Sequence, residues 1–415
     1  MSASCVIGCN GDSSPVAWQP DQCHNPHLII GGSSGSGKTY TLREIINALS
    51  AQNISFTVID KHGDFDGLDA VHEYCFRYGF NRGINPLSIE PGIEYGGPQF
   101  AALSFVSLIN EISGVHKLGP EQNNMLNNAI TDLFRANGIK QESPETWNQE
   151  QYPDLNDLTR FLMHKYKKIL IGAGKDKDVD SLYKKKKHLE KLEKAAAREE
   201  DVASDIEETI TTLVSQYEAY LRKGLLNDRD FLIYTNAKGL LGIKNRIEHY
   251  GKVGVFVKDE ISLKNARLNI KYLEDEQKKI VVYYVLKRLL DRFSKAAVTK
   301  KIRHYIVIDE CAFFLEISKI KQQIKKIVQE GRKFGLGIIM ATQNPLHFDE
   351  DILLNSASKM IFSVEPVVYK NIVRSFGIDA KVLSSMKPRV NCLFSTNTNG
   401  NGGYKLVQRT RQTYR

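Results

Sequence analysis

Residues 27–52 carry the patterns of a strand, a glycine-rich loop and a helix, in that order. The loop, GSSGSGKT at residues 32–39, matches GxxxxGK[ST], whose glycines let successive backbone N–H groups turn toward phosphate oxygens. An apolar run precedes it at 27–31 and an amphipathic pattern follows at 41–52, so the helix N-terminus adds its partial positive charge. We therefore expect nucleotide contacts from Gly32, Ser33, Ser34, Gly35, Ser36, Gly37, Lys38, Thr39 and Tyr40.

Two side chains of this loop indicate which ligand binds. Lys38 is placed to reach the β- and γ-phosphates, and the Thr39 hydroxyl is placed to hold Mg²⁺. The expected ligands are ATP and Mg²⁺.

A second motif supplies the acids that hydrolysis needs. In HYIVIDEC at 304–311, an apolar run ends in Asp309 and Glu310, which is typical of a Walker B strand. We expect Asp309 to help bind Mg²⁺ together with Thr39, and Glu310 to polarise the attacking water as general base. The simpler alternative is a buried strand that merely ends in two acids.

Further apolar runs of strand length alternate with helical patterns along the chain. Continuous apolar runs of this kind favour a parallel sheet covered on both faces, and their alternation with helices predicts an α/β fold. The predicted strands lie at 27–31, 55–60, 254–257, 304–309, 337–342, 359–364 and 391–395.

Asp60 ends the predicted strand at 55–60 and is followed by the turn-rich segment KHGDFDG. A residue at the carboxyl end of such a strand faces the ligand crevice of an α/β sheet, which predicts an active-site role for Asp60. The alternative is that Asp60 caps the loop that follows it.

The segment QEGRKFGLG precedes the predicted strand at 337–342. Arg332 and Lys333 lie where a helix ends, and residue types alone favour a role in complementing the helix dipole before Gly335. Gln343 follows the strand, where a polar side chain is in reach of a γ-phosphate or of water.

The middle of the chain lacks strand patterns and is rich in Lys, Glu, Ala and Leu, which predicts helices, with a helical hairpin as one arrangement. The run KKKK at 184–187 is either a solvated helix face or a patch that faces DNA or a partner. Residues 396–405, rich in Asn and Gly, are typical of a loop or hairpin tip, and a short basic tail follows.

The formal net charge of +9 permits a polyanionic partner without requiring one. The six cysteines are scattered, with no CxxC pair, which fits reduced thiols in a cytoplasmic protein. No stretch is apolar enough to span a bilayer, and the N-terminus shows no signal-peptide pattern.

Taken together, these motifs resemble the HerA/FtsK superfamily of P-loop motors, and most closely its HerA-like helicase and translocase ATPases. The resemblance rests on the lead-in to the phosphate loop and on the loop itself. It rests also on VIDKHGDF, YIVIDEC, EGRKFGLGIIMATQNP and ILLNSASKMIF. It covers most of residues 1–135 and 250–400.

The resemblance implies a RecA-like core that assembles into a ring, usually a homohexamer, which threads double-stranded DNA through its channel. It implies that Arg332 acts as an arginine finger on the neighbour's nucleotide, with Lys333 as a possible substitute, and that Gln343 acts as a sensor. Such motors usually act with a nuclease or other effector protein, in DNA repair or antiviral defence.

Well-known HerA proteins carry a β-barrel before the motor, and with Gly32 so early in the sequence we expect none here. The expected parts are an N-terminal part of the core (1–150), a helical insertion (151–250), a C-terminal part of the core (251–400) and a basic tail (401–415).

The leading hypothesis is a DNA-translocating ATPase. The alternatives are a conjugation, secretion or DNA-packaging ATPase, and an ATP-gated oligomeric scaffold that holds an effector protein. The expected DNA contacts are the loop after Asp60 and the segment His347–Asp351, with the lysine run at 184–187 as rival.

Overall fold

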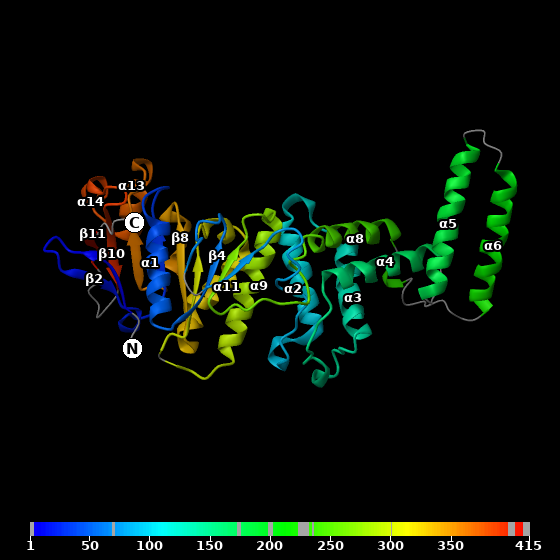
Figure 1. The fold of residues 1–415 in the computed structure, drawn as a ribbon, viewed down its shortest axis with the longest axis horizontal. Coiled ribbons are helices and arrows are strands. Elements are labelled where there is room, and N and C mark those ends of the chain that lie inside the picture. The colour runs from blue at the N-terminus through cyan, green and yellow to red at the C-terminus, as the bar shows by residue number, and fades with distance from the viewer. Residues whose placement is uncertain are drawn as a thin grey trace. The chain divides into compact units, whose positions relative to one another are not determined.

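A computed structural model describes residues 4–68, 71–171, 176–197, 202–222, 232–234, 236–299, 301–396 and 403–409. The chain forms two compact units (Figure 1). The first joins Met1–Ile84 to Glu260–Arg415, and the second, Asn85–Asp259, is inserted between those segments. Residues 85–150, expected in the ATPase core, thus cluster with the inserted unit.

The first unit is built on one sheet with the strand order β2-β1-β11-β10-β9-β3-β8-β7-β4-β6-β5. The bounds are β1 (Cys5–Cys9), β2 (Pro15–Trp18), β3 (Leu28–Gly31), β4 (Ser55–Asp60), β5 (His72–Cys75), β6 (Ala266–Asn269), β7 (His304–Ile308), β8 (Leu336–Thr342), β9 (Ser358–Ile361), β10 (Asn391–Thr396) and β11 (Lys405–Gln408).

The sheet from β9 to β5 is parallel, and its strands are the predicted apolar runs in most cases. In register, Gly31 at the end of β3 lies beside Thr342 of β8 and Ile361 of β9. The carboxyl ends of these strands therefore meet at one edge, which is where the phosphate loop begins.

The remaining strands, β10, β11, β1 and β2, add an antiparallel extension beside β9. β10 and β11 form a hairpin, as the sequence between them predicts, although residues 397–402 at its tip lie outside the described residues. The extension brings the first and last strands of the sequence together, because β1 pairs with β11.

Helices cover both faces of this sheet (Figure 1). On one face, α1 (Lys38–Ala51) buries Leu42, Ile45, Ile46 and Leu49 at helical spacing against the strands. Each such side chain contributes about 1.5–3 kcal/mol when it is fully removed from water. On the other, α9 (Asp275–Ser294) and α11 (Ser318–Glu330) pack together, and α11 contacts β8.

Shorter helices complete the first unit. They are η1 (Pro20–Gln22), α10 (Ala312–Leu315), η5 (Gly331–Phe334), η6 (Pro345–His347), α12 (Glu350–Leu354), η7 (Pro366–Val368), α13 (Tyr369–Phe376) and α14 (Ala380–Ser385).

The described residues of the second unit form helices and no strands. α4 packs on α8, α2 on α3, and α5 on α6, the last pair being the predicted hairpin. The bounds are η2 (Ile93–Tyr95), α2 (Gly97–Ile112), η3 (Gly114–His116), α3 (Pro120–Ala136), η4 (Pro144–Thr146), α4 (Leu155–Ile171), α5 (Asp176–Ala196), α6 (Ala203–Arg222) and α8 (Ala237–Gly251).

One predicted strand is wrong. Residues 254–257 form an irregular segment after α8, in which Val255 and Phe256 are buried without joining the sheet. A short apolar run buries its side chains equally well in a loop, so periodicity alone does not distinguish the two. Conversely, the short strands β1, β5, β6 and β11 carry polar residues or glycine, β2 begins with a proline, and none of the five was predicted.

Candidate functional site

The phosphate loop leaves β3 and enters α1 at the carboxyl edge of the sheet. Gly37, the residue before the helix, has φ 113°, which a side chain rarely tolerates. Gly32 has no room for a side chain, because a Cβ there would lie 2.5 Å from Cβ of Phe362. These two glycines therefore allow a tight backbone loop directly above the sheet, as phosphate binding requires.

Lys38 turns back across this loop. Its Nζ donates hydrogen bonds to the carbonyl oxygens of Gly32 at 2.6 Å and Ser33 at 2.9 Å, and the residue is buried. Burial lowers the pKa of Lys38, while the charges of Asp309 and Glu310 oppose that shift. The ammonium thus lies within electrostatic reach of both Walker B acids.

The loop also holds an unused polar group. The Ser36 hydroxyl is buried and has no hydrogen-bond partner in the described part of the chain. A buried hydroxyl without a partner costs free energy, so it favours a ligand that supplies one. This group, the two glycines and Lys38 fit a bound polyphosphate.

Asp309 and Glu310 follow β7 at the same edge. Asp309 is 6% exposed, and its Oδ1 accepts a hydrogen bond from the Glu310 N–H at 2.9 Å. Glu310 is partly exposed and has φ 52°, a strained value for a residue with a side chain. Such strain is typical of functional sites, and here it sits on the predicted general base.

Burial raises the pKa of Asp309 to about 6, with the Glu310 and Asp60 charges adding to the shift and Lys38 opposing it. A carboxylate in such a site is stabilised by a cation. Asp309 and Thr39, with phosphate oxygens and water, would make the kind of sparse oxygen site that Mg²⁺ prefers. The described residues contain no group of three or more His, Cys, Asp or Glu side chains that would hold a metal alone.

Asp309→Asn should stabilise the nucleotide-free protein in a pH-dependent way. Because the folded-state pKa is the higher one, the stability that Asp309 contributes is fully present below about pH 4 and lost as the pH rises through about 6. The variant should therefore gain about 3 kcal/mol at pH 8 and roughly half of that at pH 5. Urea unfolding without Mg²⁺ at both pH values measures this, and equal gains would contradict it.

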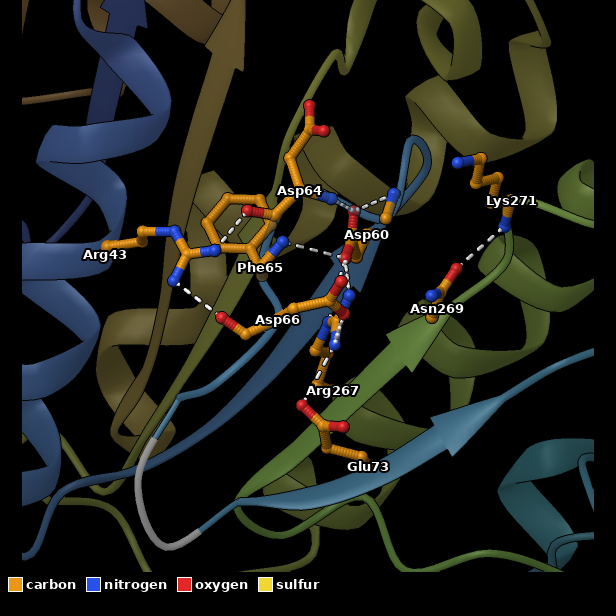
Figure 2. A network of polar contacts seen from close by, with 10 residues as sticks. Arg43, Asp60, Asp64, Phe65, Asp66, Glu73, Arg267, Asn269 and Lys271 are labelled. Atoms are coloured by element: carbon orange, nitrogen blue, oxygen red, sulfur yellow. Dashed lines mark hydrogen bonds and ion pairs between the residues drawn. The ribbon is translucent and has the colours of Figure 1, made fainter.

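Asp60 lies at the end of β4 and is buried (Figure 2). Its carboxylate accepts hydrogen bonds from the N–H groups of Gly63 at 2.7 Å, Asp64 at 3.1 Å and Phe65 at 3.2 Å. It also pairs with Arg267, whose Nη2 lies 2.7 Å from Oδ2. Asp60 therefore caps the loop that follows it, as the alternative interpretation predicts, and its role in hydrolysis stays a prediction.

Arg267 on β6 is the buried centre of this network, and its role was not predicted from the sequence. Its guanidinium also pairs with Asp66 at 2.5 Å and Glu73 at 2.9 Å, so it joins β6 to β4, β5 and the loop between them (Figure 2). Arg43 of α1 holds the same loop through the carbonyl oxygens of Asp64 and Asp66. Its segment, ARLN, alternates apolar and polar residues and so gave no local signal for a buried arginine.

The other predicted nucleotide contacts lie close to the loop. Thr39 and Tyr40 are partly exposed in the first turn of α1. Gln343 is exposed directly after β8, and the preceding residue, Thr342, accepts a hydrogen bond from the Gly32 N–H at 3.2 Å. The structure thus brings Gln343 to the edge that carries the phosphate loop.

Arg332 lies elsewhere. It is exposed on η5, directly before β8 begins, and its guanidinium donates to the backbone carbonyl of His24, which precedes β3. Because β3 and β8 are parallel, this is the amino edge of the sheet, opposite the phosphate loop. β8 has seven residues and so spans about 20 Å between the two edges, at roughly 3.3 Å per residue.

The two segments expected to contact DNA both make contacts within the chain. Asp349 pairs with Lys321 and Lys325 of α11, each at 2.9 Å, so the segment His347–Asp351 is tied to that helix. In the loop after Asp60, the Lys61 ammonium lies 4.2 Å from the centre of the Phe313 ring.

The lysine run lies on α5, where Lys184 and Lys187 are exposed and Lys187 pairs with Glu190 at 2.6 Å.

Among the described helices, none is long and apolar enough to cross a membrane. The six cysteines are free thiols, and burial raises the pKa of Cys5 and Cys392 to about 12.

The sheet order, the phosphate loop and the Walker B acids define an α/β P-loop ATPase. A profile of the family described as the central domain of the helicase HerA matches residues 5–240, more than half of the chain. The chain therefore belongs to this family, and the predicted resemblance to HerA/FtsK-type P-loop ATPases is confirmed.

Curated relatives carry helicase names. The chain is 23% identical over 377 residues to the probable helicase MJECL08 of Methanocaldococcus jannaschii, covering 88% of this chain and 61% of the relative. It is 23% identical over 357 residues to the DNA double-strand break repair helicase HerA of Sulfurisphaera tokodaii, covering 84% and 57%. The chain thus spans about three fifths of these relatives' length.

Two solved structures share the fold. VirB4 of Thermoanaerobacter pseudethanolicus has a TM-score of 0.67 at 14% identity, covering 99% of this chain and 97% of that chain. The plasmid coupling protein TrwB, solved in complex with ADP and Mg²⁺, has a TM-score of 0.55 at 11% identity, covering 95% and 87%. These matches confirm the predicted α/β P-loop fold.

Lys38→Ala should weaken ATP binding at least about a hundredfold, because it removes charge-assisted hydrogen bonds to the phosphates from a site shielded from water. Titration of a labelled ATP analogue measures this. Lys405→Ala, which removes an exposed lysine from β11, is the matched control and should bind normally. Tight binding by Lys38→Ala would contradict the assignment of the loop.

Proposed function

We propose that this chain is an ATP-hydrolysing motor that assembles into a homohexameric ring and translocates on double-stranded DNA. The observation that supports the proposal most directly is the position of Arg332. An arginine about 20 Å from the phosphate loop of its own chain, measured along β8, is too distant for its own nucleotide. An exposed arginine at one edge of the sheet and a phosphate loop at the other suit a head-to-tail ring, in which each finger meets the neighbour's loop.

Each residue then has a separate task. Lys38 and the backbone N–H groups of the loop bind the β- and γ-phosphates, and Thr39 and Asp309 would hold Mg²⁺. Bound Mg²⁺ would neutralise charge that develops on the phosphates. Glu310 accepts a proton from the attacking water, and Gln343 contacts that water or the γ-phosphate. Arg332 of the adjacent subunit stabilises the transition-state charge.

Duplex DNA is the cargo that the names of the relatives and the net charge of the chain favour. Relatives named DNA double-strand break repair helicases support it, and the net charge of +9 is compatible with it. We further propose a nuclease or other effector protein as partner, in repair or antiviral defence. A conjugation, secretion or packaging motor has the same core, as the likeness to VirB4 and TrwB illustrates.

DNA-stimulated ATP turnover is the test. Turnover should rise with duplex DNA, and more with long than with short duplexes, because a translocating ring falls off the ends. Binding should be independent of sequence and fall steeply with salt through counterion release. The Glu310→Gln protein is the control, since it should bind DNA without turnover. A ring that neither binds DNA at low salt nor responds to it would favour the scaffold alternative.

A further inference from the structure

One arginine near the C-terminus contacts the phosphate loop and lies outside the sequence motifs that form the site. Arg389 lies in the turn between α14 and β10. Its Nε donates a hydrogen bond to the Gly35 carbonyl oxygen at 3.1 Å, and its backbone N–H donates to the Ser36 carbonyl oxygen at 3.0 Å. It thus holds two consecutive peptide groups of the loop by their oxygens.

The turn imposes an unusual backbone on Arg389. Its φ is 63°, a left-handed value that favours glycine. Hydrogen bonds hold the turn in place, since the Asn391 side chain accepts from the Lys387 N–H at 2.9 Å and the Val390 carbonyl accepts from the Arg409 N–H at 2.8 Å. The protein therefore keeps an arginine, instead of a glycine, at a strained backbone position beside the phosphate loop.

The same part of the antiparallel extension also contacts α1. The Arg409 guanidinium pairs with Glu44 at 2.7 Å and lies 5.3 Å from the centre of the Tyr40 ring. Because Arg409 also bonds to Val390, the contacts to the loop and to the helix come from one connected piece. The antiparallel strands thus brace the phosphate site from outside the parallel core.

We propose that Arg389 is a positioning residue for ATP, which holds the Gly35 and Ser36 carbonyls outward so that the phosphate loop keeps its shape and the Gly37 N–H stays aimed at the phosphates. Because the C=O and N–H of a trans peptide group point in opposite directions, holding the Ser36 oxygen on one side presents the Gly37 N–H on the other. Such preorganisation raises affinity because the loop need not order on binding. The inference rests on ATP binding by the loop, as in the proposed function, and assigns the antiparallel extension a role there.

Arg389→Gly gives a clean test, because glycine keeps the backbone N–H to Ser36 and relieves the left-handed strain while the guanidinium is lost. We expect the KM for ATP to rise about tenfold, as for the loss of one charge-assisted hydrogen bond, with kcat within about twofold. The thermal midpoint should not fall. Arg389→Lys, which keeps the charge and a donor, should recover most of the affinity.

Asn53→Gly is the matched control. Asn53 is exposed, has φ 56° and follows α1 at its far end, so the variant relieves the same strain away from the ligand. Its KM should not change. An unchanged KM in Arg389→Gly, or a fall in kcat alone, would overturn the inference. If the wild type itself binds no ATP, the proposed function fails instead, whereas absent DNA stimulation with normal ATP binding leaves the Arg389 result valid.

Discussion

The Glu310→Gln protein should bind ATP as tightly as the wild type and hydrolyse it roughly a hundred to ten thousand times more slowly, the usual contribution of a positioned general base. The amide keeps the shape of the side chain and cannot accept a proton from water. The φ of 52° at this position should be retained, because glutamine has nearly the same shape and volume as glutamate and so does not disturb the packing around the backbone. Single-turnover measurements at saturating ATP separate this loss of chemistry from any change in binding.

Glu316→Gln is the control for this experiment. Glu316 is exposed at the end of α10, a few residues beyond Glu310, and its replacement removes the same charge from the same segment. It should hydrolyse ATP at nearly the wild-type rate. Normal turnover in Glu310→Gln would mean that another residue orients the water, and Asp60 would then be the next carboxylate to replace despite its contacts with the loop.

The central sheet and the phosphate loop could be predicted because their signals are local. A buried parallel strand appears as an apolar run, and the loop appears as a glycine pattern between a strand and a helix. Asp309 and Glu310 could be predicted for the same reason, because they directly follow a buried apolar run. The run at 254–257 misled because a loop buries valine and phenylalanine as well as a strand does.

The contacts that complete the site depend on residues far apart in sequence. Arg267 meets Asp60 from a strand that lies beyond the whole helical unit, and Arg389 reaches Gly35 from the other end of the chain. Neither arginine lies in a recognisable motif, because each is defined by its partners in space. The position of Arg332 at the amino edge likewise required the parallel register of β3 and β8.

Mixed rings should reveal whether Arg332 acts across a subunit interface. Arg332→Ala alone should lower turnover by about three to five orders of magnitude, the effect of removing an arginine finger. Lys38→Ala alone should also be inactive. In an equal mixture, however, about a quarter of the interfaces join an intact loop to an intact finger, so about that fraction of wild-type turnover should return if interfaces act independently.

A second mixture controls for assembly. Lys38→Ala and Glu310→Gln both damage the nucleotide-binding side of a subunit, so no interface in their mixture has an intact one, and turnover should stay absent. Lys333→Ala tests the neighbouring exposed lysine and should remain largely active if Arg332 is the finger. Equal failure of both mixtures, with mixed rings demonstrated, would contradict a finger in trans. Since Arg332 cannot reach the loop of its own chain along β8, that result would remove it from the hydrolysis mechanism altogether.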